Sequence, residues 1–123
     1  MMKKNSATTK LKSYTIDASN RVVGRLASEV ATIIRGKTSA EYSPHVLPQV
    51  NVTILNIDKI KISEKKLDST FYYHYSGYPG GMKSRSVRDF FEKSPKSLFL
   101  KVIDNMIPAN KLKKSILKRI KFE

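Results

Sequence analysis

The sequence predicts a small α/β domain with a basic exterior, and three observations support this fold class. A short alternating segment, Tyr14–Asp17, leads directly into a segment of helical spacing. The run Val50–Ile57 is continuously apolar-rich with β-branched members, which is typical of a strand covered on both faces in a parallel sheet. Further helical segments follow from Ser86 onward. The length of 123 residues fits one domain.

Composition indicates a polyanionic partner. Lys and Arg total 24 against 10 Asp and Glu, which gives a formal charge of +14 and a pI near 10.1. Basic domains of this kind gain affinity by displacing counterions from nucleic-acid phosphates, and an anionic membrane surface is the other candidate. The apolar content of 40% is sufficient for a modest core, so the chain is not a disordered basic tail.

The first strand is expected at Tyr14–Asp17, and Ser19 or Asn20 is expected to cap a helix that begins near Val22 or Val23. Gly36 followed by Lys37 provides the stop. The apolar stripe of this helix consists of Val23, Leu26, Ala27, Val30, Ile33 and Ile34.

Gly24 lies in the first turns of that helix, where glycine costs stability unless a close neighbour needs the space. A packed strand is the favoured neighbour, and an RNA backbone is the alternative. Arg21, Arg25 and Arg35 lie off the apolar stripe, and Glu29 is their one opposite charge on the helix. These arginines are therefore candidates to face a phosphate backbone.

The middle of the chain is expected to hold a central strand at Val50–Ile57. In Asp58–Ile62 the apolar and basic side chains then alternate, and Ser63–Lys66 is expected to form a polar, basic turn. A further strand is expected to begin near Phe71.

The segment Tyr73–Arg85 combines aromatic rings, three glycines and two cations in a stretch expected to be irregular. Glycine lets a backbone approach a ligand closely, Pro79 stiffens the turn, and Arg88 adds a further positive charge nearby. A tight turn whose tyrosines cover the edge of a core is an equally good interpretation from these residues alone.

Two helices are expected after this segment. Ser86 and Asp89 form a capping box for the first, and Pro95 occupies the favoured N1 position of the second, which ends by Pro108. The apolar stripe of the second helix is Leu98, Val102, Ile103 and Met106.

Asn110 is expected to cap a last helix, Lys111–Lys121, in which six of eleven residues are basic. No acidic side chain occurs between Asp104 and Glu123, so intrahelical pairs cannot neutralise this charge. An external anion is therefore expected. Docking on a membrane is less favoured, because the aliphatic face is short and has no Trp or Phe before Phe122.

Motifs of enzymes and of cofactor or metal sites are missing. The first strand and helix are joined without a GxGxxG or a Walker lysine loop, and His45 and His74 have no metal-binding spacing. Scattered Ser, His and Asp residues give no triad signal. The chain contains no cysteine, and no apolar run approaches the roughly twenty residues that span a bilayer. We expect no enzyme activity, no cofactor, no metal, no membrane partner and no small-molecule substrate.

From Tyr14 to about Phe122 the chain resembles one family, the universal large-ribosomal-subunit protein thirteen in its bacterial or organellar form. Four blocks carry the resemblance in the expected order. They are Ile16–Ala18 with Gly24–Ala27; Gly36, Lys37 and Tyr42–His45 with Asn56; His74 with Ser76–Gly81; and Met106, Pro108, Asn110 and Leu112. The sequence departs from the family pattern at Tyr14, Glu64, Asn105, Lys113 and Lys114, and it lacks the longer C-terminal tail of many relatives.

The resemblance implies a single three-layer α/β/α domain over residues 13–123, with a small, mostly parallel sheet of about four strands and a basic C-terminal helix. Residues 1–12 are expected to form a flexible basic arm. The implied function is that of a structural, non-catalytic component of the large ribosomal subunit that binds rRNA early in assembly. The implied partners are large-subunit rRNA and neighbouring ribosomal proteins, and the implied location is the cytoplasmic ribosome, with an organellar ribosome also open.

Basic helix faces and the glycine loop are expected to clamp rRNA through phosphate and sugar contacts, with His74 and Tyr78 stacking on or hydrogen-bonding an exposed nucleotide. The expected rRNA-binding residues are Arg21, Arg25, Lys37, Tyr42, His45, Lys66, His74, Gly77, Tyr78, Gly80, Gly81, Lys83, Arg85, Arg88, Lys111, Lys113, Lys114, Lys118 and Arg119. The alternative function is that of a regulatory RNA-binding protein acting outside the ribosome. An enzyme of Rossmann-like ancestry ranks below it.

Overall fold

The computed structural model describes residues 11–123 of the chain. Residues 1–10 of the expected N-terminal arm lie outside the described residues, and Lys12 is already the first residue of a strand.

Three parallel strands form the central sheet. They are β1 (Lys12–Asp17), β2 (Val50–Leu55) and β5 (Ile120–Phe122), in the order β1-β2-β5. The register places Tyr14 beside Val52 and Val52 beside Ile120. The mostly parallel sheet is thus confirmed, with three strands where about four were expected.

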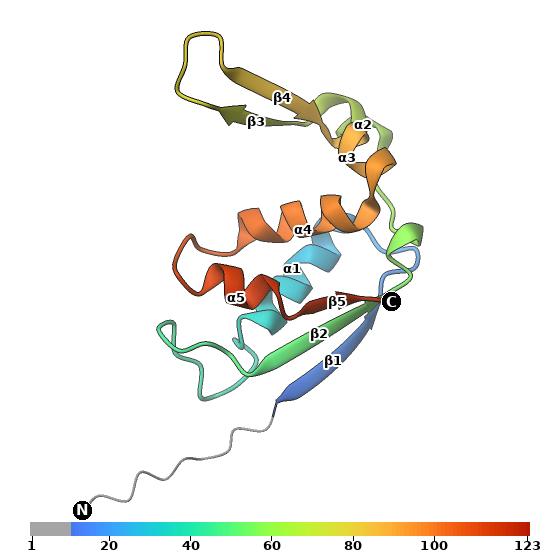
Figure 1. The fold of residues 1–123 in the computed structure, drawn as a ribbon. Coiled ribbons are helices and arrows are strands. Elements are labelled where there is room, and N and C mark those ends of the chain that lie inside the picture. The colour runs from blue at the N-terminus through green and yellow to red at the C-terminus, as the bar shows by residue number, and fades with distance from the viewer. Residues whose placement is uncertain (1–10) are drawn as a thin grey trace, which may run out of the picture.

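The helices α1 (Val23–Ile34) and α4 (Pro95–Met106) lie over the same face of this sheet (Figure 1). Side chains alternate between the two faces of a strand, and the register aligns Ile16 with Ile54 and Phe122 on the face toward the helices. That face is therefore apolar. The core between sheet and helices contains the fully buried side chains Leu26, Ile34, Ile54, Phe99 and Ile103. The ring of Phe99 meets that of Phe122 edge-on, with centroids 6.2 Å apart, and so ties α4 to β5.

The opposite face of the sheet is polar. It carries Ser13, Thr15, Asp17, Asn51, Thr53 and Lys121, which are exposed or half-buried. Along the chain each new strand of this sheet is added on the same side, in the order β1, β2, β5. Right-handed crossovers that all run in the same direction place their helices on the same face of the sheet. The expected α/β class is confirmed, whereas the second helical layer expected over the other face is not seen among residues 11–123.

The start of α1 differs from the expected cap. Val22 holds the N-cap position without a side-chain hydrogen bond, and the amide of Val23 donates instead to the carbonyl of Lys61 at 3.1 Å. Asn20 adopts a left-handed conformation (φ 58°), and the amide of Ser19 donates to Asp17. The cap predicted at Ser19 or Asn20 is therefore wrong, because a distant backbone carbonyl satisfies the helix terminus.

Asp17 closes the carboxyl end of β1. Its Oδ1 accepts hydrogen bonds from the amide of Ser19 at 2.9 Å and from Nδ2 of Asn56 at 3.3 Å. The bonds from Ser19, followed by that from Asn56, lower the pKa of the Asp17 carboxyl below its ordinary value of 3.8.

The segment after β2 is helical where a turn was expected. A short 3-10 helix, Ile57–Lys59, is followed by α2 (Glu64–Ser69), whose N-cap Ser63 accepts from the amide of Lys66. The turn predicted at Ser63–Lys66 is therefore wrong, since Ser63 caps a helix there.

A second, antiparallel pair of strands projects away from the sheet as a hairpin (Figure 1). It consists of β3 (Phe71–Tyr75), which begins where a strand was expected, and β4 (Met82–Ser86). The prediction that Tyr73–Arg85 is irregular is therefore wrong outside the tip, since residues 73–75 and 82–85 pair as strands. Helix α3 (Val87–Lys93) then begins at the predicted capping box of Ser86 and Asp89.

The C-terminal region contains a shorter helix than expected. Oδ1 of Asn110 accepts hydrogen bonds from the amides of Leu112 and Lys113, both at 3.0 Å. Asn110 therefore provides capping hydrogen bonds at the start of the last helix, as expected. However, α5 spans only Lys113–Leu117, and the residues that follow become β5. The predicted helix over Lys111–Lys121 is thus too long, because Ile120 and Lys121 pair with β2 as part of the sheet.

Candidate nucleic-acid interface

The structure places most of the predicted rRNA-binding residues on two surfaces, while others, such as Arg25 on α1 and Lys66 on α2, belong to neither. The β3–β4 hairpin lies on one side of α4, and the loop 36–49 together with α5 lies on the other (Figure 1). We name the second surface the basic end and define it by Lys37, His45, Lys111, Lys114 and Lys118. All five of these side chains are exposed.

The elements that carry the basic end lie next to one another although they come from distant parts of the sequence. A side chain at Gly36 would approach Pro48 Cβ to 3.1 Å, and the carbonyl of Pro48 accepts from Nη1 of Arg119 at 2.6 Å. These contacts connect the end of α1 with the segment that follows α5. The positive φ of Gly36 (76°) also confirms it as the stop of α1.

Four of the predicted binding cations have partners within the chain. Arg21 pairs with Glu29, Arg88 with Asp68 at 2.6 Å, and Lys113 with Asp104 at 3.2 Å. Arg119 donates to the backbone at Pro48 and to Gln49. The hydrogen bond with Asp68, then its charge, raises the pKa of Arg88 above its ordinary value. These cations are therefore partly neutralised or held in place by groups of the chain itself.

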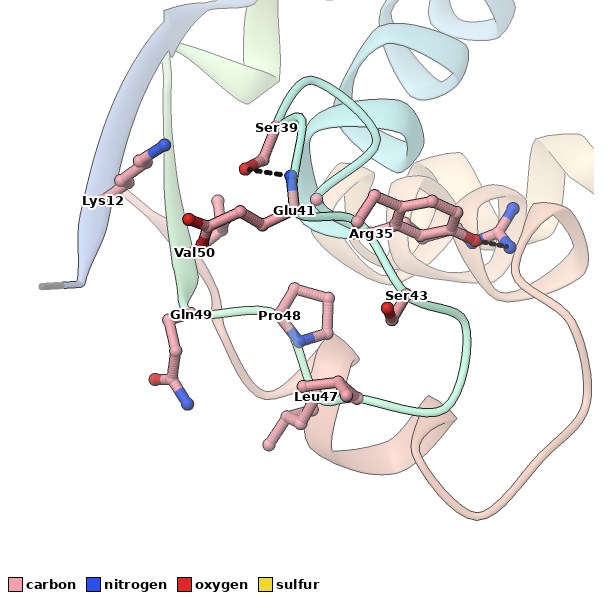
Figure 2. A pocket seen from close by; sticks show the side chains of 12 residues that line it. Lys12, Arg35, Ser39, Glu41, Ser43, Leu47, Pro48, Gln49 and Val50 are labelled. Carbon is pink, nitrogen blue, oxygen red and sulfur yellow. Dashed lines mark hydrogen bonds between the residues drawn. The ribbon is translucent and has the colours of Figure 1, made fainter. Parts of the chain in front are cut away.

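A cavity of about 250 Å³ opens beside the basic end (Figure 2). Nη2 of Arg35 donates to the hydroxyl of Tyr42 at 3.2 Å, which fixes the Tyr42 ring in the wall. Glu41, Pro48 and Gln49 also line this cavity. Tyr42 is therefore half-buried and structurally engaged, whereas His45 stays exposed.

The glycines at the hairpin tip are required by the turn itself. Gly77 and Gly80 have φ values of 90° and 72°, which side-chain-bearing residues rarely adopt. A Cβ on Gly81 would collide with Oγ of Ser76 and would lie 2.9 Å from the carbonyl oxygen of Tyr78. A tight turn is thus present, but its tyrosines do not cover the edge of a core, because Tyr73, Tyr75 and Tyr78 are 68%, 59% and 76% exposed.

One face of the hairpin carries its cations. His74 pairs with Lys83 and Tyr72 with Arg85 across the two strands, so these side chains share a face. The Tyr72 ring meets Phe90 edge-on at 5.4 Å, and the Arg85 guanidinium lies 4.4 Å from the Phe90 centroid. Burial raises the pKa of the Tyr72 hydroxyl. Arg85 is therefore anchored on α3, while His74 and Lys83 are exposed nearer the tip.

Lys101 is a cation beside the hairpin that the sequence reasoning missed. Its Nζ lies 5.8 Å from the centroid of the Tyr72 ring, so α4 adds a positive charge there. The signal available in the sequence was the helical spacing that sets Lys101 apart from the apolar stripe of α4.

Arg25 and Lys66 complete the predicted set as exposed side chains on α1 and α2. A Cβ added at Gly24 would meet no atom within 4 Å among residues 11–123. The favoured interpretation of Gly24 as a site of close packing against a strand is therefore wrong, and the alternative of an RNA backbone remains a prediction.

No helix among residues 11–123 is long and apolar enough to cross a membrane. The same part of the chain shows no group of three or more His, Cys, Asp or Glu side chains placed to hold a metal ion.

Comparisons with known proteins agree on one family. Residues 11–122 match the family described as "Ribosomal protein L13". Three similar proteins, each named large ribosomal subunit protein uL13, come from Thermotoga petrophila, Chlorobium phaeobacteroides and Geobacter sulfurreducens. They are 44%, 42% and 41% identical to this chain over 108 residues. The aligned region covers 88% of this chain and 72%, 72% and 76% of theirs.

Proposed function

Because this chain belongs to the ribosomal protein L13 family, we propose that it is a structural protein of the large ribosomal subunit that binds large-subunit rRNA and supports early assembly. The family is one of ribosomal proteins and not of enzymes, so the prediction of a non-enzymatic role is confirmed. The proposed partners are rRNA and neighbouring proteins of the subunit.

The observation that carries rRNA binding is the basic end. Lys37, Lys111, Lys114 and Lys118 are exposed there, and none of them forms an ion pair among the described residues. Asp104 on the neighbouring helix α4 already pairs with Lys113. Unpaired lysines on a common surface attract phosphates without reading base sequence, as expected of shape-based rRNA recognition.

The hairpin supplies a second contact in this proposal. Its tip presents Tyr78 on a tight glycine turn, and exposed His74 and Lys83 lie on the strands behind it. An exposed aromatic ring at such a turn can stack on an unpaired base, while the adjacent cation neutralises a phosphate. The basic end and the hairpin would then grip separate rRNA elements on either side of α4.

The experiment that tests the proposal follows a tagged copy of the chain through sedimentation of a cell extract. We expect the tagged chain in large subunits and in their early precursors. Removal of the protein should cause incomplete large subunits to accumulate. A chain found only in ribosome-free fractions, associated with particular messenger RNAs, would instead support the regulatory alternative.

A further inference from the structure

One face of the hairpin carries Tyr72, His74, Lys83 and Arg85, and we name it the cationic face. The other face has a different chemistry. The register places Phe71 opposite Ser86, Tyr73 opposite Ser84, and Tyr75 opposite Met82. Directly opposed residues of an antiparallel pair project to one side, so these six side chains form a single surface. We name it the aromatic face.

The aromatic face is exposed. Phe71, Tyr73, Tyr75 and Met82 retain between 43% and 68% of their accessible surface. The packing of the hairpin against α3 occurs through the other side, where Tyr72 and Arg85 meet Phe90. Four large apolar or aromatic side chains on one small surface are characteristic of a contact site.

The absence of charge on this face indicates what kind of partner it fits. Its six residues include no Lys, Arg, Asp or Glu, although the chain as a whole carries a formal charge of +14. A surface that grips a phosphate backbone needs cations, and the hairpin places Lys83 and Arg85 on the opposite side. Tyr and Met are enriched in the cores of protein–protein interfaces, where charged residues are depleted. A second copy of this chain is disfavoured by mutual charge repulsion.

We propose that the aromatic face docks against an uncharged, apolar surface of a neighbouring protein in the large subunit, while the opposite face and the tip of the hairpin contact rRNA. This inference rests on the proposed function, because the neighbour is supplied by the subunit. Five residues at about 3.4 Å each give the face a length of roughly 17 Å. A face of this length that is only two strands wide is smaller than the roughly 800 Å² per partner of a self-standing interface, so we expect docking in the assembled particle.

The experiment places a photo-activated benzophenone amino acid at position 73 of the full chain and irradiates purified large subunits that contain it. A matched variant carries the same group at position 83 on the cationic face. Sedimentation before irradiation establishes that each variant is in the subunit, so failure of the proposed function is recognised separately.

We expect position 73 to cross-link to another protein, giving a product that resists ribonuclease and is destroyed by protease. A ribonuclease-sensitive product at position 73 would mean that the aromatic face stacks on rRNA, and would overturn the proposal. Cross-linking to a second copy of the chain, or no cross-link in subunits that contain the variant, would overturn it as well.

A second measurement uses Tyr73→Thr with Tyr75→Thr, which removes both rings and keeps residues that favour strands. The affinity of the free protein for protein-free rRNA should stay within about twofold, since no cation is lost. Retention of the variant in salt-washed large subunits should fall about tenfold or more, as expected when two aromatic anchors are removed. An unchanged retention, or a matching loss of affinity for free rRNA, would contradict docking on a protein.

Discussion

Replacing Lys111, Lys114 and Lys118 together with glutamine should reduce both the affinity for large-subunit rRNA and its dependence on salt. These side chains are exposed and form no ion pair among residues 11–123, so their charge is available to an external phosphate. Each phosphate contact contributes about 0.7 to 0.9 to the slope of log affinity against log salt. Losing three contacts should therefore lower the slope by about 2 to 3, and the affinity at 0.1 M salt by about two orders of magnitude.

The assay is equilibrium filter binding of the purified chain to large-subunit rRNA between 0.05 and 0.5 M salt, as roughly the range over which such slopes are resolved. Lys113→Gln is the matched control, because Lys113 lies between Lys111 and Lys114 in the sequence but pairs with Asp104 at 3.2 Å. The Lys113→Gln control should change the slope of log affinity against log salt by much less than the loss of any one of the three exposed lysines. An unchanged slope in a folded triple variant would refute the assignment of the basic end to phosphate binding.

Four single substitutions test other parts of the fold. Gly81→Ala places a Cβ 2.9 Å from the backbone carbonyl oxygen of Tyr78, which should distort the hairpin tip, so rRNA affinity should fall while the denaturant midpoint of the domain changes little. By contrast, Gly24→Ala meets no atom within 4 Å and should stabilise α1 by about 0.5–1 kcal/mol in urea unfolding, with reduced rRNA affinity only if an RNA backbone approaches there. Phe99→Ala should cost about 3–5 kcal/mol in the same assay, because the ring is 1% exposed and packs on Phe122. Asp17→Asn should weaken the pH dependence of stability in acid: the folded carboxyl has a lowered pKa, so its contribution is present above the ordinary value of 3.8 and is lost as pH falls through the lower value of the folded state.

Each of these predictions has an outcome that counts against it. A Gly81→Ala variant with full affinity would show that the tip does not depend on its tight turn, and a destabilised Gly24→Ala variant would reveal a neighbour that the fold does not show. Loss of stability below about 1 kcal/mol for Phe99→Ala would place its ring outside the core. An acid unfolding curve unaltered by Asp17→Asn would mean that the carboxyl titrates alike in the folded and unfolded chain.

Local signals predicted the elements whose ends are set by neighbouring residues. The capping box of Ser86 and Asp89, Pro95 at the start of α4, and Gly36 at the end of α1 are all seen in the structure. In each of these cases the residue that determines the boundary is next to it in sequence, so side-chain chemistry and backbone conformation are sufficient.

The elements that were predicted incorrectly depend on distant partners. Residues 120 and 121 follow a helical pattern, yet together with Phe122 they pair with β2, because a sheet edge far away in the sequence offers hydrogen bonds. The N-terminus of α1 needs no Ser or Asn cap because the carbonyl of Lys61 reaches the amide of Val23. Neither partner can be identified from the residues beside the boundary.

The predicted binding residues divide in the same way. Composition and spacing identified a basic chain with an aromatic glycine segment, but they could not tell which cations were available. Lys113 pairs with Asp104 of α4, Arg88 with Asp68 of α2, and Arg119 with the backbone at Pro48, and each contact joins separate elements. Sequence neighbours gave no sign of these pairs.

The sequence by itself determined the α/β class, the family and the positive charge, because these follow from periodicity, ordered motifs and composition. The tertiary structure decided which lysines remain exposed on the basic end, and that the Tyr73–Arg85 segment is a hairpin with one cationic and one aromatic face. The physical reason is that each residue type has a fixed charge and polarity. Whether a side chain is free to contact a partner depends on which other groups the fold brings next to it.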